Sequence, residues 1–406
     1  MTQHLPLTGV RVTDFTWIGA GSYTTKILAD AGAEVIKIES ADRVDSLRLA
    51  APYKDGVKGV NRSGYFADRN SSKRSLTLNM KHPRALDLVF RLIRQSDIVA
   101  NNFTPGVMER FGLGYDAVRA VKEDIVYLAM SMQGSTGPQK HYLGYGATMA
   151  AVTGIQQLTG LPGREPAGTG TNYPDHIPNP CHATFAVLAA LRHRRRTGEG
   201  QRIDMAQTEP TVALLGPAVL EYTANGHVPQ PRGNRHEQAA PHGVFRCAGD
   251  DRWIAIAVMT DAQWRGLAAA LGAPAWMNDA RLATTSGRLA NVDEVEERLN
   301  AETAGHGVEA LVLALQAHGV PAGRVSTAAD VIEDPQLRHR GHWLTLDHPE
   351  MGPSLYNAQP FRNARSPAGQ ARPAPLLGQH THEICRTLLG LDEAEIARLT
   401  EDGVLR

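Results

Sequence analysis

Residues 7–40, LTGVRVTDFTWIGAGSYTTKILADAGAEVIKIES, decide the fold class of this chain. Residues 7–15 and 33–40 are short runs rich in strand-forming residues. Residues 22–32 between them are typical of a helix closed by Gly32, because glycine readily adopts the left-handed conformation that ends a helix. A strand, a helix and a second strand in this order open a doubly wound parallel sheet.

The same alternation continues to about residue 134. Strands are predicted over 73–81, 96–103 and 124–134, with an amphipathic helix over 82–97, whereas residues 51–70 look irregular. A polar, turn-rich linker follows residue 228, and residues 244–258 resemble a hairpin followed by helical runs at 261–272, 291–302 and 308–319. We therefore predict an α/β protein with a Rossmann-like large domain formed by 1–228 and 329–406, and a small α+β domain at 229–328.

Composition excludes several classes of function. The 406 residues are 42% hydrophobic and 21% charged, as in an ordinary soluble globular protein. Lys plus Arg and Asp plus Glu both total 42, so the formal net charge is zero. We therefore expect neither a nucleic acid nor a membrane surface as partner.

Targeting and metal-binding signals are also lacking. The N-terminus has no basic segment before an apolar run, and no stretch is long and apolar enough to span a membrane. Cys181, Cys247 and Cys385 lie far apart, and the histidines are scattered. We predict a cytoplasmic protein with reduced thiols and no metal site.

The turn after the first strand contains Gly19, Ala20 and Gly21. With Glu39 further along, it half-matches a dinucleotide-binding fingerprint, but Thr24 occupies the position of the third glycine. An NAD-dependent dehydrogenase is therefore an alternative that Thr24 opposes. Glycines here would also let a phosphate or thioester approach the backbone closely.

Residues 168–204 carry the other chemical signal, because a polar loop with Asp175 runs into an apolar helix. Residues 183–191 are apolar except for Thr184, which predicts a helix buried on nearly all faces. The partial positive charge at its N-terminus would keep the Asp175 carboxylate ionised. Asp175 then either caps this helix or acts as a nucleophile or base.

Several motifs, taken together and in this order, resemble the family III CoA-transferases, which are related to the α-methylacyl-CoA racemases. The segments that carry the resemblance are 14–16 with 20–21, 32–39, 73–81, 102–106 with Arg110, Asp175 before 188–191, 197–201, and 374–378 with 380–381. The resemblance covers nearly the whole chain.

The resemblance implies that Asp175 is the nucleophile. In this family the aspartate attacks the donor thioester to give a mixed anhydride, and the released CoA thiolate then forms an aspartyl-CoA thioester. The acceptor carboxylate reverses these steps. A carboxylate suits this chemistry because anhydride and thioester are close in reactivity.

The resemblance also implies a CoA site. Residues Leu78, Met80 and Lys81 would hold adenine and ribose; Asn102, Phe103 and Arg110 would lie along the phosphates and pantetheine; and Gly19 and Ala20 would lie beside the thioester. Cations and apolar side chains are suited to phosphates and adenine, respectively. Lys81 and Arg110 could instead be solvated charges, and Leu78 and Met80 plain core residues.

Two features depart from the family pattern. The lid loop that is glycine-rich in formyl-CoA transferases corresponds to 233–238 here, with one glycine and an additional cation, Arg235, that could bind a substrate carboxylate. In the racemases a histidine follows the glycine that matches Gly144, whereas this chain has Tyr145. A 2-methylacyl-CoA racemase is therefore the weaker alternative, and Tyr145 joins the expected substrate-binding residues.

The segments from 52 to 83 look most like the benzylsuccinate branch of the family. This branch implies succinyl-CoA as donor and an aryl- or alkyl-substituted dicarboxylate as acceptor. The family resemblance implies an interlocked homodimer, and this branch adds the alternative of a heterodimer with a related subunit. No tightly bound cofactor is expected, since CoA thioesters are substrates. A non-catalytic acyl-CoA-binding subunit is the remaining alternative.

Overall fold

The computed structural model describes residues 5–366, 369 and 372–406. Its centre is a six-stranded sheet in which all neighbouring strands are parallel, in the order β3-β2-β1-β4-β5-β6. The strands are β1 Arg11–Asp14, β2 Glu34–Glu39, β3 Arg74–Thr77, β4 Ile98–Asn101, β5 Val126–Ala129 and β6 Gln201–Asp204. This is the doubly wound order, so the predicted α/β fold class is confirmed.

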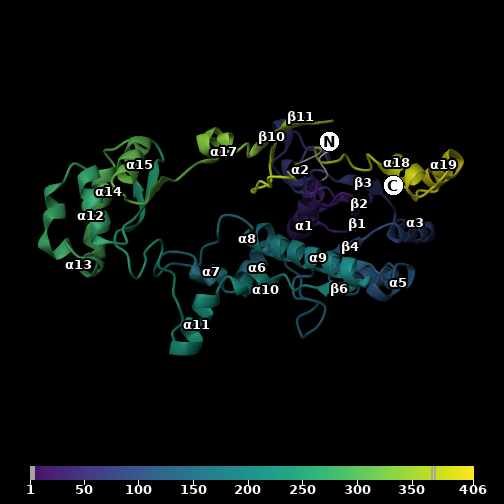
Figure 1. The fold of residues 1–406 in the computed structure, drawn as a ribbon, viewed down its shortest axis with the longest axis horizontal. Coiled ribbons are helices and arrows are strands. Elements are labelled where there is room, and N and C mark those ends of the chain that lie inside the picture. Colours follow the sequence, from purple (N-terminus) through teal and green to yellow (C-terminus); the bar gives the residue numbers. More distant parts are fainter. Residues whose placement is uncertain (1–4, 367–368, 370–371) are drawn as a thin grey trace. The chain divides into compact units, whose positions relative to one another are not determined.

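Helices cover both faces of this sheet (Figure 1). On one face, α1 (Ile18–Asp30) and α9 (Pro178–Thr197) pack on apolar residues such as Val35 and Leu128. The opposite face packs against α3 (Pro83–Arg94), α5 (Tyr115–Val121), α18 (Thr381–Thr387) and α19 (Glu393–Glu401). The C-terminal helices α18 and α19 therefore complete a core that the N-terminal half of the chain begins.

Residues 46–225 and 343–357 also contain shorter elements. They are η1 Ser46–Leu49, η2 Lys54–Gly56, α2 Gly64–Asn70, α4 Val107–Arg110, α6 Gly146–Val152, α7 Ile155–Leu158, α8 Tyr173–His176, α10 Thr208–Ala213, α11 Gly216–Asn225 and the antiparallel pair β10 Trp343–His348 and β11 Gly352–Asn357. The helix α2 lies in a region that we predicted to be irregular. Its glycine start and short length conceal it, although Ser63 caps it by accepting from the Phe66 N–H.

The chain forms two compact units. Unit 1 comprises Met1–Gln156, Gly168–Pro229 and Arg338–Arg406, and contains the parallel sheet; unit 2 comprises Gln157–Ala167 and Gln230–Leu337. The predicted domain boundaries at 229 and 328 stay a prediction, to be tested by limited proteolysis.

Unit 2 is an α+β structure with its own apolar core around Trp264, Leu267 and Leu299. Its antiparallel strands are β7 His242–Arg246, β8 Trp253–Ala257 and β9 Ala322–Arg324. Its helices are α12 Asp261–Ala270, η3 Ala275–Asn278, η4 Ala280–Leu282, α13 Thr285–Ala290, α14 Val292–Thr303, α15 Val308–Ala317 and α16 Ala328–Glu333, and α17 Pro335–His339 leads out of it. The predicted hairpin and the three predicted helical runs are all present.

Two predictions about helices are wrong. Helix α1 begins at Ile18 rather than at residue 22, so the glycines of the predicted turn lie in its first turn. Helix α9 is not buried on nearly all faces, because Phe185 and Leu188 are 73% and 42% exposed. An unbroken apolar run does not reveal which of its faces a neighbour covers. In the described part of the chain, no helix has both the length and the apolar character needed to cross a bilayer.

Candidate active site

A cavity of about 580 Å³ opens in unit 1 at the carboxyl ends of the parallel strands. Its wall includes Phe15, Ser40, Met80 and Phe103, which follow the ends of β1, β2, β3 and β4, and Gly19 from the first turn of α1. Doubly wound sheets bind their ligands at this edge, where the strand order reverses between β1 and β4. Asp175 reaches the same cavity from the short helix α8.

Asp175 is closely surrounded by backbone. The residue is only 4% exposed, and the Gly146 N–H donates a hydrogen bond to its carboxylate. A Cβ at Gly146 would lie 2.7 Å from Oδ2 of Asp175, and one at Gly19 would lie 2.9 Å from the Asp175 Cβ. Only glycine fits at these two positions, so the first turns of α1 and α6 press against the carboxylate.

Burial raises the pKa of Asp175 to about 6, although the Gly146 hydrogen bond and the charge of Arg69 oppose the shift. We had expected the partial positive charge of a helix N-terminus to favour the ionised form of Asp175. The pKa is raised instead, because the desolvation of the carboxylate outweighs that charge. The capping interpretation is also wrong, since no side chain caps α9, which begins after Ile177. Asp175 is thus a buried carboxylate on the cavity wall that is mostly ionised at neutral pH.

One side chain ties the turn from β1 into α1 to the next loop. Asn102 donates from Nδ2 to the Trp17 carbonyl at 2.7 Å and accepts the Trp17 N–H at 2.8 Å. A Cβ at Gly21 would lie 2.7 Å from Cγ of Asn102, so glycine permits this close packing. The close approach of a phosphate or thioester to this turn stays a prediction.

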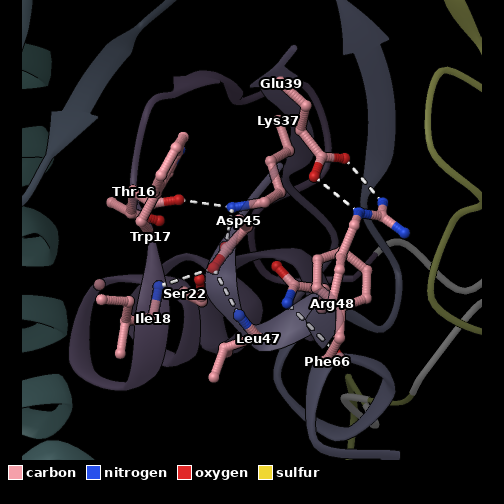
Figure 2. Close-up of polar contacts among 12 residues, drawn as sticks. Thr16, Trp17, Ile18, Ser22, Lys37, Glu39, Asp45, Leu47, Arg48 and Phe66 are labelled. Atoms are coloured by element: carbon pink, nitrogen blue, oxygen red, sulfur yellow. Dashed lines mark hydrogen bonds and ion pairs between the residues drawn. The ribbon is translucent and has the colours of Figure 1, made fainter. Parts of the chain in front are cut away.

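Beneath the turn lies a group of buried charges that we call the charged bed: Asp14, Lys37, Glu39, Asp45, Arg48 and Lys73. Its ion pairs are Lys73–Asp14 at 3.1 Å, Lys37–Asp45 at 3.0 Å and Arg48–Glu39 at 2.7 Å. Figure 2 shows the latter two pairs. Both oxygens of Glu39 accept from Arg48, so this carboxylate is not free for the ribose contact that an NAD site requires.

Burial and the ion pairs act against each other on the pKa values of the charged bed. Lys73, Lys37 and hydrogen bonds from Thr16 lower the pKa of Asp14 although burial opposes them. Asp45, Asp14 and Glu39 likewise raise the pKa of Lys37 against the effect of burial. The pairs therefore offset desolvation at Asp14 and Lys37, whereas burial lowers the pKa of Lys73 to about 8 although the charge of Asp14 opposes the shift.

The structure brings nine of the ten predicted site residues to the cavity wall. They are Gly19, Ala20, Leu78, Met80, Lys81, Asn102, Phe103, Tyr145 and Asp175. The tenth, Arg110, is exposed on α4 and does not line the cavity, although Thr104 and Val107 just before it do. Its side chain lies at the end of this one-turn helix, and its expected place along the phosphates and pantetheine of CoA stays a prediction.

These wall residues differ in how much they can offer a ligand. Leu78 is fully buried and packs in the core behind the wall, whereas Met80 is half-buried. Lys81 is exposed. Tyr145 is 64% exposed and carries a phenol where the racemases have an imidazole.

Trp17 and Arg43 are among the wall residues that the sequence analysis did not name. The guanidinium of Arg43 lies 5.4 Å from the ring centroid of Trp17, and this ring meets Phe103 edge-on at 6.0 Å. Both Trp17 and Arg43 line the cavity. No local motif marks them, because they follow the ends of β1 and β2 in loops of unremarkable composition.

Arg235 in unit 2 is not free for a substrate carboxylate. It pairs with Asp293 at 2.5 Å and with Glu296 at 2.7 Å. Among residues 5–366, 369 and 372–406, His, Cys, Asp and Glu side chains nowhere gather in threes as a metal site would need.

The family model for CoA-transferase family III matches residues 7–381. The chain belongs to CoA-transferase family III. The resemblance seen in the sequence is thus confirmed, and so is its classification as an enzyme of CoA transfer.

This CoA-transferase is 33% identical over 404 residues to the succinyl-CoA–D-citramalate CoA-transferase of Chloroflexus aurantiacus, with 98% of each chain covered. It is 32% identical over 386 residues to the succinate–glutarate CoA-transferase of Agrobacterium fabrum, covering 94% of this chain and 96% of that one. A CAIB/BAIF family protein from Brucella suis, of known crystal structure, matches with a TM-score of 0.87 and 32% identity, over 95% of this chain and all of the other.

Proposed function

We propose that this enzyme transfers CoA from succinyl-CoA to a dicarboxylic acid, with Asp175 as the covalent nucleophile. The observation that carries the proposal is the Asp175 carboxylate, which lies on the wall of the cavity directly against the first turn of α1. Both relatives described above have names that pair a succinyl group with a second dicarboxylic acid.

In the first half-reaction, an Asp175 oxygen attacks the succinyl-CoA carbonyl and the C–S bond breaks, giving a mixed anhydride and CoA thiolate. The thiolate attacks the aspartyl carbonyl and releases succinate, which carries away the bridging oxygen. In the second half, the acceptor carboxylate attacks the aspartyl thioester and displaces CoA thiolate. The thiolate then attacks the acceptor carbonyl, and Asp175 leaves as a carboxylate.

The amides of Gly19 and Ala20 are the proposed oxyanion donors. They lie in the first turn of α1, where no carbonyl of the same helix can accept from them. Donors fixed before the reaction stabilise the developing charge of each tetrahedral intermediate. A carboxylate with a pKa of about 6 is more basic than an ordinary aspartate yet still mainly ionised at neutral pH, which favours its role as nucleophile.

The remaining wall residues are suited to CoA. Lys81 and Arg43 supply cations for phosphates, and Met80, Phe103 and Trp17 supply apolar surface for adenine and pantetheine. The expected contacts of Leu78, Asn102 and Tyr145 with CoA belong to the same proposal. We propose no tightly bound cofactor.

We further propose that the enzyme is a cytoplasmic dimer. Helices α9 and α11 expose large apolar side chains, including Phe185 at 73% and Leu220 at 65%. Large apolar side chains that are this exposed favour a protein partner. A second copy, interlocked with the first, is the proposed partner, and a related subunit is the alternative. Light scattering of the purified chain tests this.

The decisive experiment for Asp175 is mass spectrometry of the protein after mixing with succinyl-CoA alone. The peptide containing Asp175 should gain CoA, lose it in hydroxylamine, and stay unmodified in Asp175→Asn. Wild-type protein that stays unmodified with succinyl-CoA and with a panel of other acyl-CoA thioesters contradicts the proposal.

The acceptor is then identified by presenting acids to the isolated adduct. Glutarate, citramalate and aryl- or alkyl-substituted succinates should discharge it with formation of the acyl-CoA product, and matched monocarboxylates should not. Equal discharge by monocarboxylates would show that the dicarboxylate class is wrong while leaving the nucleophile intact.

A further inference from the structure

Ile18 has a backbone conformation that its side chain disfavours. Its φ is 59°, in the left-handed region that β-branched residues rarely adopt. Among the described non-glycine residues with positive φ, it alone is β-branched. Such a conformation persists only where the surroundings impose it, and it often marks a functional site.

The charged bed holds this residue in place. Oδ1 of Asp45 accepts the Ile18 N–H at 3.2 Å and the Leu47 N–H at 3.0 Å. Oδ2 of Asp45 pairs with Lys37, whose ammonium also donates to the Thr16 carbonyl at 2.5 Å (Figure 2). The Lys37–Asp45 ion pair therefore hydrogen-bonds to the backbone on both sides of Trp17, at the Thr16 carbonyl and the Ile18 N–H.

The turn that this ion pair holds lies directly against the Asp175 side chain. Gly19 follows Ile18, and a Cβ added to it would lie within 3.2 Å of three Asp175 side-chain atoms. A change at Ile18 would therefore rotate the Gly19 and Ala20 amides relative to the Asp175 carboxylate. A misplacement of about 1 Å can cost on the order of 100-fold in rate.

We propose that the buried Lys37–Asp45 pair is a positioning device for CoA transfer, which holds Ile18 left-handed and thereby sets the α1 amides against Asp175. The inference rests on the proposed function of Asp175. Neither Lys37 nor Asp45 lines the cavity, so they act through the turn and not by touching substrate. Buried ion pairs often add little to stability compared with apolar replacements, so stability alone does not account for this one.

The chain offers a matched control in Lys26–Asp30. This pair is equally buried, lies at 2.5 Å, and belongs to the same helix α1, but at the end remote from Ile18. The double variant Lys26→Met/Asp30→Asn removes a buried ion pair without releasing the turn.

The test measures the first-order rate of adduct formation at saturating succinyl-CoA, the succinyl-CoA concentration that gives half that rate, and Tm. In Asp45→Ala the rate should fall about 10- to 100-fold, while the half-saturating concentration changes less than about threefold. The control pair should lower Tm and keep the rate within about twofold of wild type.

Glycine at position 18 separates positioning from mere stability, because glycine adopts this φ without strain. Ile18→Gly should slow the wild type, since Ile18 lines the cavity, yet accelerate Asp45→Ala without restoring its Tm. The comparison uses four proteins: wild type, Ile18→Gly, Asp45→Ala and the double variant. If Asp45→Ala does not fold, Asp45→Asn replaces it, and a faster rate in the double variant is again the expected result.

Three outcomes overturn the proposal: an unchanged rate in the Asp45 variant, an equal loss in the control pair, or no rescue by glycine. These differ from failure of the proposed function, in which wild-type protein itself forms no adduct on Asp175.

Discussion

Beneath helix α3 the interior of unit 1 is built from apolar side chains, whereas beneath the first turn of α1 it is built from charges. Leu88, Leu92 and Ile93 are at most 1% exposed and pack without directional bonds. Lys37 and Asp45 are as deeply buried, yet they bond to specific backbone groups. The apolar core stabilises the fold through buried area, while the charged bed fixes the course of a single turn.

The largest expected effect is on kcat, and it comes from Asp175 in the cavity and not from the apolar core or the charged bed. Asp175→Asn should lower kcat by about 10⁴-fold or more, because it removes the covalent step, while the dissociation constant for CoA stays close to wild type. Steady-state kinetics and calorimetry measure the two quantities. A variant that retains a tenth of the activity contradicts the assignment.

The apolar core should respond in stability and not in chemistry. Leu92→Ala should lower the free energy of unfolding of unit 1 by about 2–5 kcal/mol, because it leaves a cavity at a fully buried site. Leu92→Met serves as the volume-conserving control and should cost less than about 1.5 kcal/mol. Urea denaturation and kcat at a temperature where the variant is folded test this. A tenfold loss of kcat in folded Leu92→Ala would remove the contrast between the two regions.

The two kinds of buried aspartate should shift stability in opposite directions. The folded-state pKa of Asp175 is raised to about 6, so ionising it costs stability at pH 7 and above. Asp175→Asn should therefore stabilise the protein by about 3 kcal/mol at pH 7.5. This gain should shrink as the pH falls from about 6 to the unfolded value near 4, below which both states are protonated.

For Asp14, whose pKa is lowered by Lys73 and Lys37, the sign is reversed. Its stabilising contribution is present above the unfolded pKa and is lost as the pH falls through the folded value. Asp14→Asn should thus destabilise at pH 7.5. Denaturation curves at a series of pH values measure the change in the free energy of unfolding for Asp175→Asn and Asp14→Asn. Changes of the same sign in the two variants at pH 7.5 contradict the contrast.

The smallest expected effect is on the pH profile. Because the attacking group must be ionised, kcat/KM should be flat above about pH 6 and fall about tenfold per pH unit below it. Initial rates in buffers of constant ionic strength measure this. A profile that stays flat down to pH 4.5 means that burial does not raise the pKa of the nucleophile.

Some of this could be predicted from the sequence. Alternating strands and helices specify the doubly wound sheet, and parallel strands deliver the residues at their carboxyl ends to one edge. The motif segments therefore located the cavity wall from Gly19 to Phe103. Arg110, on the short helix α4, is exposed and does not line this wall, so its contact with CoA stays a prediction.

Other features could not be predicted, since they depend on contacts between distant segments. Lys37 looks like an ordinary strand residue until the fold sets it against Asp45 and Thr16. Nothing local marks Ile18 as left-handed, and the pKa of Asp175 depends on how deeply the surrounding turns bury it. Local sequence indicates where a helix begins, but the pKa of Asp175 is set mainly by desolvation, which depends on the fold.

The most direct test of the covalent role of Asp175 follows oxygen. Wild-type enzyme is taken through a single turnover with succinyl-CoA and an acceptor acid labelled with ¹⁸O in its carboxylates, and the mass of the peptide containing Asp175 is then measured. The account predicts one heavy oxygen on Asp175, left there when the thiolate removes the acceptor acyl group. An unlabelled Asp175 peptide, alongside acceptor-CoA product and labelled succinate, would mean that the two acids exchange directly and that Asp175 is not the nucleophile.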